Sequence, residues 1–182
     1  YFMTARPARD RMTASGFKAG LCIGAGVVFR SSTILALPGC IVAAPNMRTR
    51  LTMLCGVLPF GIIILTYNFL RFGNIFETGY PEAWSQMPDA PDNGEFFALS
   101  AFWGNSLNLW FSSGQGYFVF SPIVICCVIG LLGHSEIPVR FILGVMIVTL
   151  SYTALYGTNF NWHGGIWSWG PRYLAPVSPM LV

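Results

Sequence analysis

Long apolar runs without charged residues alternate with polar segments along the chain and predict membrane-spanning helices. The clearest run, Leu51–Leu70, has about 20 residues and no charge, enough to cross roughly 30 Å of hydrocarbon. Two further spans are predicted at Tyr117–Gly133 and Phe141–Gly157, and another begins at Tyr173. Pro59 lies inside the first run and predicts a kink, which a bundle of helices tolerates.

The run Phe17–Ala44 is harder to place, because as one helix it would be about 42 Å long. It also carries Arg30 in its middle. The basic residues that flank it are Arg6, Arg9, Arg11 and Lys18 before it, and Arg48 and Arg50 after it. The positive-inside rule places both groups in the cytoplasm, which a single crossing cannot do. We therefore expect two short helices bent near residues 31–33, with Arg30 at the outer turn.

This topology puts the N-terminus in the cytoplasm and a loop of about residues 71–112 outside. Five of the seven acidic residues fall in that loop, and all six tryptophans lie outside or at the outer boundary. The predicted fold is an all-α polytopic transmembrane helix bundle with about five to six membrane segments, one pair of them short and broken. Residues 1–182 are expected to form a single membrane domain. Because the chain opens on Tyr1 and stops inside an apolar run, we expect it to be a fragment of a longer protein.

Composition supports the membrane assignment, since 54% of the residues are hydrophobic and 9% are charged, whereas soluble domains carry about 25% charged residues. The net charge of +3 is too small and too scattered for a nucleic-acid partner. All five cysteines lie in apolar runs without CxxC spacing or a partnering histidine, which argues against a disulfide framework or a zinc site. No metal site is predicted, and a divalent cation is the one cofactor left open.

Two segments of the first half carry candidate chemistry. Arg30 is one, because a charge in mid-membrane costs about 2.5–3.5 kcal/mol on insertion scales; it either snorkels to headgroups or contacts a lipid phosphate. The other is residues 67–80, where aromatic rings alternate with asparagines, Arg71 and Glu77. This pattern suits a sugar site, since rings stack on pyranose faces while polar groups bond hydroxyls. An aromatic belt with an ordered turn at residues 72–74 explains it equally well.

The segment 162–174 combines three tryptophans, three glycines, His163 and Arg172 between two apolar runs. Indole rings such as that of Trp167 collect at membrane–water boundaries. An arginine fixed there by Gly-Pro geometry can grip a phosphate in bidentate fashion. We therefore interpret the segment as a water-facing rim with an anion contact.

Gly16, Gly20 and Gly24 repeat at four-residue spacing, which lets two helices approach closely in lipid. This spacing indicates packing and does not identify the partner helix.

The run from Gly20 to Arg30, followed by Ile34-Leu35-Ala36-Leu37-Pro38, resembles a segment of the polyprenyl-phosphate-dependent glycosyltransferases of the GT-C class. That class includes the protein O-mannosyltransferases and the bacterial aminoarabinose transferases. Residues 67–80 and the Trp-x-Gly-Gly…Trp-Gly-Pro-Arg-Tyr run also look like motifs of bacterial relatives.

The resemblance implies a lipid-phosphate sugar donor bound from the outer leaflet of a bacterial inner membrane, and an inverting transfer. The catalytic base of that class is an Asp in the first external loop, which no position here matches. The chain would thus be the C-terminal part of the enzyme's membrane module, with catalytic residues unknown. The candidate substrate-binding residues are Arg30, Arg71, Arg172, Glu77, Trp167 and His163.

A non-catalytic transmembrane subunit that packs against other transmembrane subunits is the alternative. The glycine stripe fits this reading equally well. A transporter with broken helices accommodates Arg30, but the sequence shows no inverted repeat.

Overall fold

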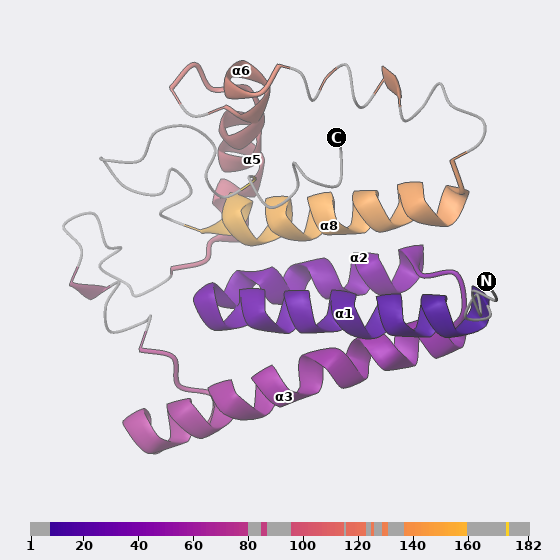
Figure 1. Cartoon of the computed structure of the whole chain (residues 1–182). Helices are drawn as coiled ribbons and strands as arrows, with labels where there is room; N and C mark the ends of the chain where they lie inside the picture. The colour runs from indigo at the N-terminus through magenta and orange to yellow at the C-terminus, as the bar shows by residue number, and fades with distance from the viewer. Residues whose placement is uncertain are drawn as a thin grey trace. The chain divides into compact units, whose positions relative to one another are not determined.

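A computed structural model of the chain describes residues 8–79, 85–86, 96–114, 116–122, 125, 129–130, 137–159 and 174. In this part of the chain every regular element is a helix, and one isolated β-bridge joins Phe97 to Asn159. The all-helical prediction is therefore confirmed. Contacts divide the chain into two compact units, residues 1–77 and 78–182, which are treated separately below. Figure 1 labels the helices of both units.

The longest helix, α3 (Met47–Phe72), contains the whole of Leu51–Leu70, so this predicted segment is helical. It begins where the side chain of Asn46 accepts a hydrogen bond from the amide of Thr49, which satisfies one of the open amides of the first turn. It continues through Pro59 and ends at Gly73, whose φ of 72° is a left-handed conformation that glycine adopts without strain.

The predicted interruption near residues 31–33 is also present. Helix α1 (Ala8–Phe29) stops before Arg30, whose backbone is extended (φ −152°, ψ 108°). A 3₁₀ turn η1 (Ser31–Leu35) and the short helix α2 (Ala36–Ala43) follow. Hydroxyl side chains compete for backbone partners and weaken a helix at such a point. Thr33 does so here, because its hydroxyl donates to the carbonyl oxygen of Gly26 at 3.3 Å.

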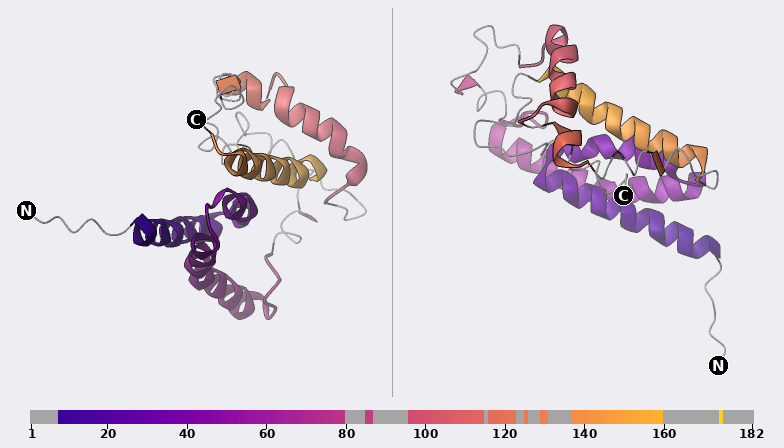
Figure 2. Two further views of the ribbon diagram at one scale, coloured as in Figure 1. Left: turned by 90° about the vertical axis from the view of Figure 1, so that its right-hand side faces the viewer. Right: turned by 90° about the horizontal axis from the view of Figure 1, so that it is seen from above.

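Helices α1 and α3 run in the same direction, and η1 and α2 run back along α1, which lies between α2 and α3 in Figure 1. The glycine stripe lies in this contact. Gly16, Gly20 and Gly24 meet Thr49, Met53 and Phe60 in that order. A parallel pair requires the chain to reverse twice between Phe29 and Met47. Figure 2 shows the same helices from the end and from above.

In the second unit, α5 (Phe102–Phe111) crosses α8 (Val139–Thr158) at a steep angle (Figure 1). Gly157 in α8 faces Phe102 and Ser106 in α5. One turn earlier in α8, Thr153 accepts a hydrogen bond from Trp110, which lies one turn later in α5. The short helix α6 (Tyr117–Phe120) and the turn η2 (Leu99–Ala101) complete the described elements. The apolar core of this unit contains Leu109, Tyr117, Val145, Val148 and Tyr152.

One prediction for this half of the chain needs correction. The span at Tyr117–Gly133 is not one helix, because α6 ends at Phe120 and Ser121 leaves helical geometry (φ −134°, ψ 61°). Pro122 explains the break, since a proline pushes the preceding residue out of the α region. The external loop predicted at about residues 71–112 contains the helix α5. The predicted segment Phe141–Gly157 is helical, because it lies within α8.

Two described helices, α3 and α8, are long and apolar enough to cross a membrane. Only 17% of the most apolar window of α3 and 33% of that of α8 is buried. A core helix of a soluble domain would bury most of its surface, so both helices expose the side chains that a bilayer would cover. The predicted count of five to six segments extends beyond what the described residues show.

Candidate functional site

The six predicted substrate-binding residues fall into two groups. Arg30, Arg71 and Glu77 belong to the first unit and are described. His163, Trp167 and Arg172 lie outside the described residues. The geometry of the candidate site therefore comes from the first unit.

Arg30 directly follows the last residue of α1. It is half-buried, and its amide still donates to the carbonyl oxygen of Gly26 at 2.8 Å, so it closes the last turn of the helix. Its neighbour Phe29 is 91% exposed. The break thus presents a guanidinium and an uncovered aromatic ring next to each other.

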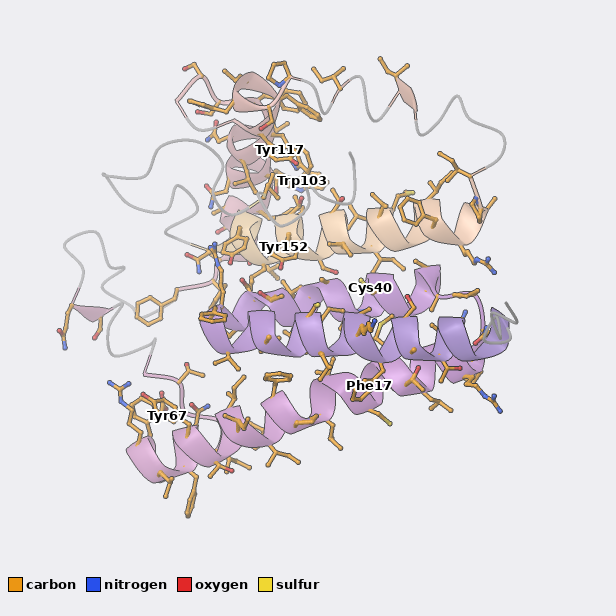
Figure 3. The ribbon with its side chains drawn as sticks, viewed as in Figure 1. Phe17, Cys40, Tyr67, Trp103, Tyr117 and Tyr152 are labelled. Atoms are coloured by element: carbon orange, nitrogen blue, oxygen red, sulfur yellow. The ribbon has the colours of Figure 1, made fainter. Side chains whose placement is uncertain are left out.

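Arg71 is placed by the last turn of α3. Its Nη1 donates a hydrogen bond of 2.7 Å to the hydroxyl of Tyr67, one turn earlier in the helix. The guanidinium carbon lies 5.1 Å from the centre of the Phe72 ring and 5.8 Å from that of Tyr67, within cation–π range. Figure 3 shows Tyr67 near the C-terminal end of α3. Because a guanidinium has five N–H donors, this arrangement orients Arg71 while using one of them.

The ordered turn that we predicted at residues 72–74 is present after Arg71. Asn68 is buried in α3, and its Nδ2 donates to the carbonyl oxygen of Ile75 at 3.3 Å. Asn74 accepts from the amide of Phe76 at 3.0 Å, and its carbonyl oxygen accepts from the amide of Glu77 at 3.3 Å. The turn holds Glu77, half-buried, a few residues beyond Arg71. The asparagines of the 67–80 run therefore have structural roles in this turn.

Arg30 and Arg71 lie at the same end of the first unit. In the glycine stripe, each α1 residue contacts a residue about 35 positions later in α3. Because both helices rise by about 1.5 Å per residue, this offset holds along the whole contact. On that register Arg30 is level with Leu65. Arg71 lies about 9 Å further along α3. Two guanidinium groups from separate helices thus gather toward one end.

The other end of the unit carries the remaining described basic side chains. Lys18, Arg48 and Arg50 lie there, because α3 begins beside the first turns of α1. Arg50 is half-buried and donates from Nη2 to the carbonyl oxygen of Ala44 at 3.4 Å. The expectation that the double reversal brings Lys18 together with Arg48 and Arg50 is confirmed.

A polar contact between α5 and α8 was missed by the sequence analysis. Trp110 Nε1 donates to the hydroxyl of Thr153 at 3.2 Å, and Asn105 Nδ2 donates to the carbonyl oxygen of Asn159 at 3.3 Å. The hydroxyl of Ser106 is buried against Gly157 without a hydrogen-bond partner. The signal that could have revealed it is the group of hydroxyl residues between positions 149 and 158, inside an otherwise apolar run.

The chemistry that the described site can perform is anion binding. Among the described side chains, Glu77 is the one carboxylate, and no group of three or more His, Cys, Asp or Glu gathers to hold a metal ion. Oriented guanidinium groups neutralise a phosphate without transferring a proton.

Comparison of the chain with protein-family models, curated proteins and solved structures gives no match in any of the three.

Proposed function

We propose that this chain is the C-terminal part of the membrane module of a polyprenyl-phosphate-dependent glycosyltransferase, with its donor site at the outer face of a bacterial inner membrane. Arg30 and Arg71 bind the phosphate of the lipid-linked sugar. The observation that carries the proposal is their position at one end of the first unit, on separate helices, each beside an exposed aromatic ring.

The proposed role of the arginines is electrostatic. As the glycosidic bond to the donor breaks, negative charge develops on the departing phosphate, and preorganised cations stabilise that charge. Tyr67 and Phe72 hold the Arg71 guanidinium before a ligand arrives, which lowers the entropy lost on binding. We assign His163, Trp167 and Arg172 to the same donor site, and the catalytic acid to sequence upstream of this chain.

The glycine stripe does not support the alternative of a non-catalytic subunit. That alternative drew support from Gly16, Gly20 and Gly24 as a surface for partner helices. These glycines are buried against α3 of the same chain. The stripe is therefore accounted for by packing within the first unit, and a partner subunit is no longer needed to explain it.

The test measures binding of a short-chain polyprenyl phosphate to the whole chain in lipid nanodiscs, with the uncharged polyprenol as the ligand control. We expect Arg30→Ala and Arg71→Ala each to weaken binding roughly tenfold, because a hydrogen bond to a charged group contributes about 1.5–3 kcal/mol. Arg48→Ala is the matched control, since Arg48 is an exposed arginine at the opposite end of α3. Equal losses in all three variants, or no loss in any, would refute the donor site.

A further inference from the structure

The charge-free lengths of the helices in the first unit do not match. In α3 the stretch between Arg50 and Arg71 covers residues 51–70, which is about 30 Å of helix and equals the hydrocarbon thickness of a bilayer. In α1 the stretch between Lys18 and Arg30 covers residues 19–29, which is only about 16 Å. The two helices lie side by side, so one bilayer cannot fit both.

The mismatch falls mainly at the end that carries Arg30. Suppose that α3 sets the hydrocarbon boundary at Leu70. Arg30 is level with Leu65 and therefore lies about 7 Å inside that boundary. Phe29, at this depth, is 91% exposed, so its ring is not packed inside the first unit. Arg30, which is half-buried, therefore lies below the hydrocarbon boundary that α3 sets.

A bilayer accommodates a short hydrophobic segment by thinning, and a buried arginine draws headgroups and water toward itself. We infer that the outer leaflet is locally thinned beside the Phe29–Arg30 break, so that phospholipid headgroups and their water reach about 7 Å below the level of Leu70. The occupant of this surface is the headgroup layer of ordinary phospholipids. The inference rests on the membrane placement in the proposed function, but not on the sugar donor.

The depression would give a lipid-linked phosphate a way down to the level of Arg30 without removing its hydration. The opposite face of α3 offers no such path, because its exposed side chains between Leu51 and Leu70 are uncharged. The thinning is therefore expected on the α1–α2 side alone.

The experiment places single spin labels on the whole chain in phospholipid nanodiscs, after replacement of the five native cysteines by alanine. Phe29→Cys and Val28→Cys report on the break. Leu65→Cys is the matched control at the same level on α3, and Leu58→Cys reports on the middle of the membrane; both leucines are exposed. The measured quantity is relaxation of each label by a water-soluble nickel chelate relative to oxygen, in power-saturation spectra.

We expect the nickel chelate to reach positions 28 and 29 several-fold better than position 65, and Arg30→Leu to reduce this difference. Equal protection at 28, 29 and 65, with position 58 also protected, would overturn the thinning while leaving α3 in the membrane. Free access at position 58 would overturn both the thinning and the proposed membrane placement. Access at 28 and 29 together with unaltered donor binding in the arginine variants would support the thinning and refute the proposed donor site.

Discussion

The carbonyl oxygen of Met53 occupies the place where a β-carbon on Gly20 would lie. Gly56 makes the reciprocal contact, since a β-carbon there would meet the carbonyl oxygen of Phe17 and the amide nitrogen of Leu21. In lipid no hydrophobic force draws helices together, so close packing between small residues supplies much of the attraction. The α1–α3 contact therefore depends on the absence of side chains at two facing positions.

The first prediction follows from this contact. Gly20→Ala should destabilise the first unit by about 1–3 kcal/mol, because the obstacle is backbone, which cannot swing aside as a side chain can. Gly61→Ala is the matched control, since nothing lies within 4 Å of a β-carbon at Gly61 in the same pair of helices. The control should be neutral or slightly stabilising. Thermal unfolding in detergent measures both, and equal melting temperatures for the two variants would contradict the close approach.

The second prediction concerns the start of α3. The side-chain oxygen of Asn46 accepts from the amide and from the hydroxyl of Thr49, both at 2.9 Å. Asn46→Ala removes this cap and should cost about 1 kcal/mol of unfolding free energy. Asn46→Asp keeps an acceptor oxygen and should retain most of the stability. Denaturant titrations followed by circular dichroism compare the three proteins, and an Asp variant as unstable as the Ala variant would argue against the cap.

The third prediction concerns the contact between α5 and α8. Ser106→Ala removes a buried hydroxyl that has no hydrogen-bond partner and should leave stability unchanged or raise it by about 1 kcal/mol. Trp110→Phe leaves the Thr153 hydroxyl without its donor and should lower stability by about 1 kcal/mol. The two changes lie one turn apart in α5, so opposite shifts in melting temperature would distinguish the polar contact from general sensitivity of that helix.

The fourth prediction is the sidedness of the chain. Lys18→Cys and Arg48→Cys should react with a membrane-impermeant thiol reagent only from the cytoplasmic side, because both residues lie at one end of the first unit. Asp92→Cys, outside the described residues, should react only from the external side, as the predicted topology requires. The cysteine-free chain is the background. Labelling of positions 18 and 48 from different sides would contradict the parallel arrangement of α1 and α3.

The fifth prediction comes from the sequence of the rim segment. Arg172→Ala should abolish binding of the polyprenyl phosphate while the chain remains folded in detergent. A circular dichroism spectrum and a melting curve confirm folding before the affinity is measured. An unchanged affinity would remove residues 162–174 from the proposed donor site and leave Arg30 and Arg71 as its basic residues.

The long elements of this fold could be predicted because length and composition decide them. Leu51–Leu70 and Phe141–Gly157 are long apolar runs, and the helices α3 and α8 extend only a few residues beyond them. The break at Arg30 could be predicted for an electrostatic reason, since basic residues on both sides of one segment require a reversal. Each of these arguments needs only residue type and order.

The remaining features depend on contacts that residue order does not specify. The spacing of Gly16, Gly20 and Gly24 predicts close packing but not that α3 is the partner. Helix α5 is only 10 residues long, and its aromatic residues equally fit an external loop at the membrane boundary. Pro122 could have been recognised as the end of α6, but the apolar residues on both sides of it favoured a single span. The hydrogen bond between Arg71 and Tyr67 follows from four-residue spacing once the helix is known.

The interruption at Arg30 also constrains biosynthesis. Neither α1 nor the η1–α2 segment offers enough uncharged length to partition into lipid alone as the chain leaves the ribosome. In the proposed membrane placement, both would therefore depend on Met47–Phe72, and the three helices would enter the bilayer together.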